Sequence, residues 1–177
     1  MDWRTIGLGL RIGGHRGAAG EAPENTYAGF DLAALAGVDY LEFDVQLLAD
    51  GVAVVIHDDQ LDRTSDGHGP VAGATETTLA RLDAGAWFDP RFAGEPVPTL
   101  AGMVRWLEAR PFLGATIEAK GIGTGDRIAR TIAASPQPAT PPSRSHRKSA
   151  TESTDENERS MIHPATGRPM SWLSAKM

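Results

Sequence analysis

Residues 38–59, VDYLEFDVQLLADGVAVVIHDD, decide the fold of this chain because they alternate polar and apolar side chains around a turn signal. Over residues 40–47 the odd positions are apolar, and the even positions, which include Glu42 and Asp44, are polar. Alternation with a period of two puts the two sets on opposite faces of a β-strand. Asp50-Gly51 favours a type I′ turn into a second strand, so the stretch predicts an antiparallel hairpin.

The register of this hairpin brings chemically active groups together. A two-residue loop at Asp50 and Gly51 places Asp44 directly opposite His57, with Glu42 two residues further along the same face. A β-bulge would shift that register. The plain alternative is a polar face that simply points to water. The apolar run VVI at 54–56, typical of a strand buried on both sides, argues against this alternative.

Strands and helices alternate around the hairpin. Residues 8–14 predict a first strand that delivers His15 and Arg16 at its end, and helical spacing follows from Tyr27. Residues 100–110 and 126–134 predict two further helices, and residues 114–120 predict a strand that presents Glu118 and Lys120 on one face. This order predicts an α/β fold with parallel strands.

Asn25 and Thr26 precede the first helix, where they suit either its cap or the rim of a site.

The polar ends of the three predicted strands form one chemical set. Three carboxylates suit a hard divalent cation such as Mg²⁺ or Ca²⁺ better than zinc. Two histidines suit acid and base duties, and an arginine with a lysine suits a phosphate group. The set indicates metal-assisted hydrolysis of a phosphate ester. Its members are His15, Arg16, Glu42, Asp44, His57, Glu118 and Lys120.

Five motifs occur in a specific order: GGHRG, APENT, YLEFDVQLLADGVAVVIHDDQLDRT, AWFDPRFAGEPVPTL and TIEAK. In this series the chain resembles the glycerophosphodiester phosphodiesterase family over roughly residues 8–121. The resemblance implies a (β/α)₈ TIM barrel of the phospholipase C-like phosphodiesterase kind, which splits glycerophosphodiesters into glycerol 3-phosphate and an alcohol. It also implies that residues 58–98 form the family's inserted segment.

The resemblance assigns a role to each residue of the set. Glu42, Asp44 and Glu118 take the metal positions. His15 and His57 take the acid/base positions, while Arg16 and Lys120 match basic residues near the phosphate.

The chain departs from the family in length. A (β/α)₈ barrel needs about 200 residues or more, and the family pattern stops after the third motif-bearing strand. We therefore expect a truncated, N-terminal part of the domain in residues 1–135. Residues 136–177, rich in proline, serine, threonine and charge, are expected to form a disordered tail.

Two alternative functions stay open. One is a catalytically silent fragment that keeps the metal-ligand motif. The other is a related phosphodiesterase that acts on sphingolipid or inositol lipid head groups.

The overall composition argues against several classes of binding partner. The net charge of −6 argues against nucleic acid. No cysteine is present, which excludes thiolate metal sites. The absence of a long apolar segment predicts a cytoplasmic protein without membrane insertion. Unpaired sheet edges of a partial barrel predict self-association.

Overall fold

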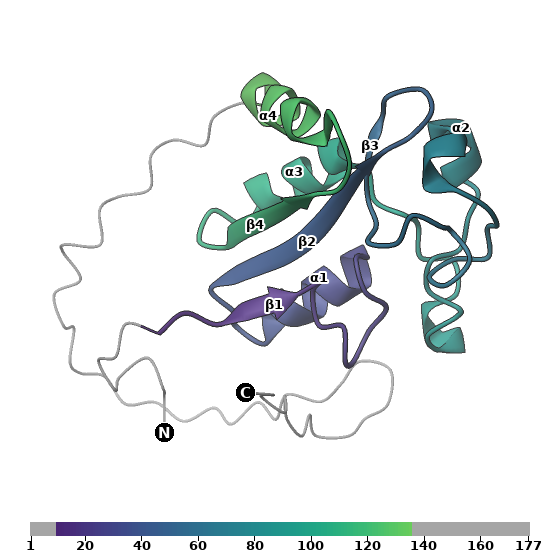
Figure 1. Cartoon of the computed structure of the whole chain (residues 1–177). Helices are drawn as coiled ribbons and strands as arrows, with labels where there is room; N and C mark the ends of the chain where they lie inside the picture. The colour runs from purple at the N-terminus through teal and green to yellow at the C-terminus, as the bar shows by residue number, and fades with distance from the viewer. Residues whose placement is uncertain (1–9, 136–177) are drawn as a thin grey trace, which may run out of the picture. The chain divides into compact units, whose positions relative to one another are not determined.

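The structure, a computed structural model, describes residues 10–135, which form a four-stranded sheet with helices packed against it (Figure 1). The elements in chain order are β1 (Gly13–His15), α1 (Tyr27–Leu35), β2 (Tyr40–Leu47), β3 (Ala53–Val55), η2 (Val71–Gly73), α2 (Glu76–Leu79), η3 (Pro90–Phe92), α3 (Leu100–Glu108), β4 (Gly114–Ala119) and α4 (Thr124–Ala134). The expected tail at 136–177 lies outside the described residues.

Strand β2 is the centre of the sheet. Strands β1 and β4 both pair in parallel with residues 40–42, so they occupy opposite edges of β2. Val45 pairs with both Val55 and Ala119, which places the antiparallel β3 on the same edge as β1. Helix α1 connects β1 to β2, and α3 precedes β4. The predicted α/β arrangement with parallel strands is confirmed, although β1 covers only Gly13–His15 and the described residues 10–12 before it are not in a strand.

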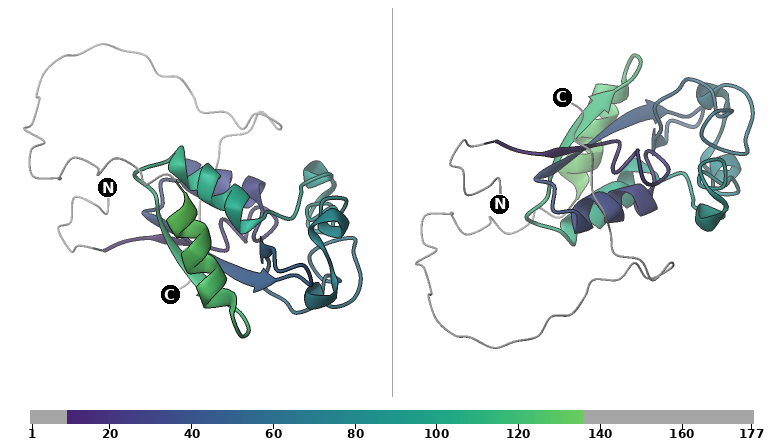
Figure 2. Two further views of the ribbon diagram at one scale, coloured as in Figure 1. Left: turned by 90° about the horizontal axis from the view of Figure 1, so that it is seen from above. Right: turned by 90° about the horizontal axis from the view of Figure 1, so that it is seen from below.

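The alternation along β2 separates a core face from a site face. Its odd-numbered side chains Leu41, Phe43 and Val45 are fully buried against the helices. Helices α1 and α3 lie next to each other on this face (Figure 2), where the rings of Phe30 and Trp106 are 6.0 Å apart. Helix α4 adds Ile128 to the same cluster. The predicted apolar face is confirmed.

The predicted hairpin forms, but its register was wrong by one residue. Val45 pairs with Val55, and the amide of Ile56, not of His57, donates to the carbonyl of Asp44. Among the described non-glycine residues only Arg16 and Asn25 have positive φ, so Asp50 does not take the conformation that a type I′ turn requires. Gly51 alone is left-handed, at φ 76°.

The loop has three residues, 49–51, closed by hydrogen bonds from Leu48 to Val52 and from Gly51 to Leu48. The extra loop residue shifts every pair beyond it.

The first helix has its cap in Thr26, whose hydroxyl accepts a hydrogen bond from the amide of Gly29 at 3.2 Å. Asn25 therefore has no capping role. Its backbone is left-handed, at φ 57°, and its side chain is directed to the polar face of β2. Of the two roles left open for the Asn25-Thr26 pair, Thr26 takes the first and Asn25 lies at the site.

Residues 58–98 lie beyond the end of β3 (Figure 1) and contain η2, α2 and η3. They enclose a second apolar cluster, in which Leu61, Val71 and Leu79 pack against Val54 and Ile56. The stretch lacks strong periodicity because its helices are only three or four residues long. Among residues 10–135, no helix is long and apolar enough to cross a membrane.

Candidate active site

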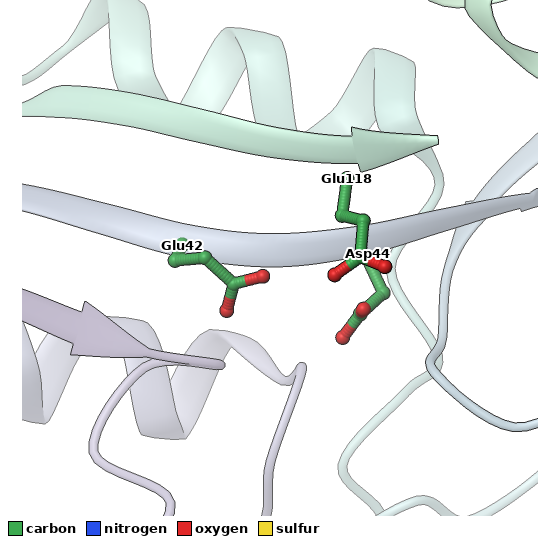
Figure 3. Close-up of side chains that lie close together, drawn as sticks. All are labelled: Glu42, Asp44 and Glu118. Atoms are coloured by element: carbon green, nitrogen blue, oxygen red, sulfur yellow. The ribbon is translucent and has the colours of Figure 1, made fainter. Parts of the chain in front are cut away.

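Three carboxylates meet on the polar face of the sheet, where Glu42 and Asp44 of β2 face Glu118 of β4 (Figure 3). One carboxylate oxygen of each lies within 4.8 Å of the others. Backbone register brings them together, because Asp44 and Glu118 are partners across the parallel strands. Glu42 is the register partner of His15 in the same way.

Asp44 is the buried centre of this cluster, with a relative exposure of 1%. Its Oδ2 accepts from Asn25 Nδ2 at 3.1 Å and lies 3.3 Å from Arg16 Nε. Its Oδ1 lies 3.2 Å from Lys120 Nζ. A buried carboxylate needs such partners, since an uncompensated buried charge is strongly unfavourable. The polar face of β2 is therefore not a simple solvated surface.

Lys120 follows β4 and bridges two of the carboxylates. Its ammonium lies 2.5 Å from Glu118 Oε1 as well as 3.2 Å from Asp44 Oδ1. The hydrogen bond to Glu118, and then the one to Asp44, raises the pKa of Lys120 above its usual value. The lysine therefore stays charged beside the carboxylates.

The end of β1 contributes His15 and Arg16. His15 is largely exposed, and its Nε2 lies 3.8 Å from Glu42 Oε2. The amide of Arg16 donates to the carbonyl of Glu42 at 2.8 Å and to its carboxylate at 3.2 Å. Arg16 has φ 54°, and the next residue, Gly17, has φ 85°. A Cβ on Gly17 would come within 2.7 Å of the carbonyl carbon of Gly29, so the His-Arg-Gly turn packs directly on α1.

His57 is held beside this cluster by a route that the predicted register did not contain. It is not opposite Asp44; instead Gln46 Nε2 donates to the carbonyls of His57 and Asp58, at 2.9 and 2.6 Å. The ring Nδ1 of His57 lies 2.7 Å from Asp58 Oδ1. A small cavity of about 10 Å³ is lined by His57 and Asn25 together, which puts the histidine next to the residue that binds Asp44.

An ion-pair network links His57 to Arg16. Arg63 donates to both oxygens of Glu24 at 2.8 Å and to both oxygens of Asp58 at 2.5 and 2.9 Å. Glu24 Oε1 also accepts from Arg16 at 3.0 Å. Hydrogen bonds from Arg63 hold the pKa of Asp58 and that of Glu24 below their usual values. Both carboxylates are thus anionic near neutral pH.

Of the seven residues predicted from the sequence, the structure brings six into direct contact with one another, and the seventh, His57, joins them through the ion-pair network of Arg63. The six are His15, Arg16, Glu42, Asp44, Glu118 and Lys120. Sequence reasoning did not single out Glu24, Gln46, Asp58 or Arg63 as structural partners. A usable signal was the charge of the segments APENT and DDQLDRT, which flank the site in space.

The donor set of the carboxylate cluster suits a hard divalent cation, since oxygen is the ligand atom that Mg²⁺ and Ca²⁺ prefer. The burial of Asp44 fits the same use, because a cation compensates a desolvated carboxylate. The oxygens lie at the carboxyl ends of parallel strands, where (β/α)₈ barrels carry their active sites.

Fold and site define an α/β protein with an acidic, cation-flanked centre. The chain belongs to the glycerophosphoryl diester phosphodiesterase family, whose family model matches residues 15–121. The family and fold expected from the motifs are confirmed. The matched residues correspond to a part of the family's (β/α)₈ barrel.

Individual relatives agree with this assignment. The chain is 50% identical over 107 residues to a putative glycerophosphodiester phosphodiesterase of Bacillus subtilis, covering 60% of this chain and 43% of that protein. It is 46% identical over 99 residues to a glycerophosphodiester phosphodiesterase of Caldanaerobacter subterraneus, covering 56% and 41%. The chain thus spans less than half the length of these curated relatives.

Solved structures resemble the chain as well. A glycerophosphodiester phosphodiesterase from Agrobacterium tumefaciens has a TM-score of 0.65 and 44% identity, covering 70% of this chain and 54% of that one. A phosphodiesterase from Oleispira antarctica, solved with the product sn-glycerol-3-phosphate, has a TM-score of 0.63 and 34% identity, covering 70% and 50%.

Proposed function

We propose that this chain provides the metal- and phosphate-binding half of an enzyme that hydrolyses glycerophosphodiesters to glycerol 3-phosphate and an alcohol, in phospholipid head-group metabolism. The observation that carries the proposal is the carboxylate cluster around buried Asp44, flanked by Arg16 and Lys120. The product found in the Oleispira antarctica relative supports the glycerol 3-phosphate half of the substrate.

Glu42, Asp44 and Glu118 would hold the divalent cation, Mg²⁺ or Ca²⁺, through one oxygen each. When bound, the cation polarises a phosphoryl oxygen. Arg16 and Lys120 lie on either side of Asp44, so their charges compensate a phosphate that approaches the same face. The buried position of Asp44 keeps water away from one side of the cluster.

His57 and His15 handle the protons in this proposal. Asp58 accepts the hydrogen bond of His57 Nδ1, which leaves Nε2 as the atom that exchanges a proton. His15 Nε2 is exposed and lies beside Glu42, so it has access to both substrate and solvent. One ring gives a proton to the leaving alkoxide, and the other removes one from the attacking hydroxyl group.

A competing proposal is a chain that binds the cation without turnover. Strand β4 motivates it: on the side away from β2 no described residue pairs with β4, and Glu118 itself is 55% exposed. Catalysis requires its groups to be held within about 0.5 Å, and an open edge weakens that restraint. The same edge supports the proposal of self-association.

The two proposals are separated by one assay. The full chain is incubated with glycerophosphocholine and Mg²⁺, Ca²⁺ or a chelator, and glycerol 3-phosphate is followed by ³¹P NMR. Cation-dependent release supports the enzyme. Cation binding by calorimetry without release supports the silent form, and the absence of both contradicts the metal site itself.

Parallel reactions with sphingomyelin and phosphatidylinositol test the lipid head-group alternative.

The cytoplasmic location expected from the sequence stays a prediction.

A further inference from the structure

We propose that Arg63 is a positioning residue that aligns the two halves of the active site, holding His57 through Asp58 and Arg16 through Glu24. The part that concerns turnover rests on the proposed function, whereas the part that concerns the alignment of His57 does not. Arg63 itself contacts neither the carboxylate cluster nor Lys120 through any hydrogen bond described in residues 10–135.

The geometry of Arg63 is that of a double fork. Nη1 and Nη2 donate to the two oxygens of Glu24, while Nε and Nη2 donate to the two oxygens of Asp58. A planar guanidinium has five N–H donors in a fixed arrangement, so it can serve two carboxylates at once. A lysine ammonium lacks this planar fork and cannot reproduce both bidentate contacts.

Arg63 joins its neighbour in sequence, Asp58, to a remote segment that contains Glu24. Glu24 lies in the connection between β1 and α1, 39 residues before Arg63, and Asp58 follows β3. Each carboxylate continues to one functional side chain: Glu24 to Arg16 at 3.0 Å and Asp58 to His57 at 2.7 Å. Arg63 is the one described residue that hydrogen-bonds both carboxylates.

The charges of Glu24 and Asp58 explain why a positively charged side chain is needed at position 63. Both carboxylates contact the same atom, Arg63 Nη2, at 2.8 Å for Glu24 and 2.9 Å for Asp58. Without the guanidinium, two anions would face each other across a few ångströms. They would separate, and each would carry its functional partner away from the other.

A purely stabilising surface ion pair is the simpler interpretation, since the Arg63 side chain is 44% exposed. Exposed pairs contribute little to stability, typically about 0–1 kcal/mol. The two interpretations differ in what they change. A surface pair affects the free energy of unfolding alone, whereas a positioning residue changes the state of the His57 ring.

The test compares Arg63→Gln with Arg63→Lys. The control is Arg91→Gln, since Arg91 pairs with Asp89 at the start of η3. Long-range ¹H–¹⁵N correlation spectra report which ring nitrogen of His57 carries the proton, and His57→Gln identifies the signals. The parent should have neutral His57 protonated at Nδ1, as the hydrogen bond to Asp58 requires.

Arg63→Gln should move the tautomer ratio of His57 toward Nε2–H by several fold, because Asp58 loses the group that fixes it. Arg63→Lys should restore it only in part, and Arg91→Gln should match the parent. Tautomer ratios in Arg63→Gln equal to those of the parent would overturn the proposal, whether or not the chain hydrolyses anything.

Turnover supplies the second readout. If the parent releases glycerol 3-phosphate, Arg63→Gln should lower kcat by up to about 100-fold, the loss expected for misplaced catalytic groups. Its melting temperature should stay close to that of Arg91→Gln. An unchanged kcat would overturn the proposal. A parent without turnover would contradict the proposed function and leave the spectroscopic result to decide on Arg63.

Discussion

Asp44 and Glu118 are register partners on the neighbouring parallel strands β2 and β4, so two carboxylates of the site meet through backbone pairing. Glu42 and His15 are related in the same way across β1 and β2. The centre of the site is therefore built on the sheet, which restrains side chains more strongly than loops do.

Asp44→Asn should abolish stabilisation by added Mg²⁺ or Ca²⁺. A ligand at about 100 times its Kd stabilises a protein by about 2.7 kcal/mol, and the variant should lose most of this gain because the amide removes the central anionic ligand. The variant should still fold without metal, because Arg16 retains its ion pair with Glu24 and Lys120 retains its ion pair with Glu118. Differential scanning calorimetry with and without cation measures the change.

The matched control for this variant is Asp89→Asn, which removes a carboxylate that pairs with Arg91 at the start of η3. It should keep the full cation-dependent shift. A normal shift in Asp44→Asn would contradict the role of Asp44.

His15→Ala and His57→Ala should each lower turnover of a glycerophosphodiester by roughly 10² to 10⁴, the usual loss for a positioned acid or base. His68→Ala serves as the control because the His68 side chain is 84% exposed and, within residues 10–135, pairs only with Asp62. Initial rates of glycerol 3-phosphate release measure the effect. A parental rate in either of the first two variants would remove that histidine from the mechanism.

Gly17→Ala should destabilise the protein by about 1–2 kcal/mol or more, because a left-handed backbone is strained for a residue with a Cβ. The added methyl group would also meet the backbone of Gly29 at 2.7 Å. Gly20→Ala is the control, since a Cβ there meets nothing within 4 Å. Urea unfolding compares the two, and equal midpoints would argue against the close packing of the His-Arg-Gly turn on α1.

Asp58 should contribute a stability that depends on pH in the acid range. Its pKa in the folded state lies below the ordinary value of about 3.9, because Arg63 hydrogen-bonds its charged form. Its contribution is thus fully present above about pH 4 and is lost as pH falls toward the folded-state pKa. The difference in unfolding free energy between the parent and Asp58→Asn should shrink as pH is lowered, and a difference that stays constant would contradict the ion pair.

Deleting residues 136–177 should leave both the melting behaviour and any activity unchanged, because this segment lacks the periodic apolar residues that pack as structure. The expectation concerns a part of the chain outside the described residues and stays a prediction. Calorimetry of the shortened protein tests it. A loss of cooperative unfolding would mean that the segment contributes to the fold.

The alternation of polar and apolar residues predicted most of the sheet. The main error, the register of the hairpin, came from the length of its loop. Alternation along β2 was sufficient to separate Phe43 from Glu42 and Asp44. The Asp50-Gly51 pair could not decide the register, because a three-residue loop uses the same left-handed Gly51 as a two-residue one. The hairpin was therefore predictable and its pairing was not.

The outer partners of the site were beyond sequence reasoning for a different reason. Arg63 and Glu24 are 39 residues apart and belong to no periodic element, so no local pattern links them. Asn25 was ambiguous because capping and site roles favour the same residue type, and only the hydrogen bond that the amide of Gly29 donates to Thr26 separates them. Long-range contacts between irregular segments can be identified only from the three-dimensional structure.

Gln46 gives the site a tolerance to change in the neighbouring segment. Its side chain fastens the backbone at His57 and Asp58 directly to β2, the strand that also carries Glu42 and Asp44. The histidine is thus anchored before the chain enters the rest of residues 58–98. Under the proposed function, changes in the later part of that segment, beyond Arg63, should therefore leave the position of His57 unchanged.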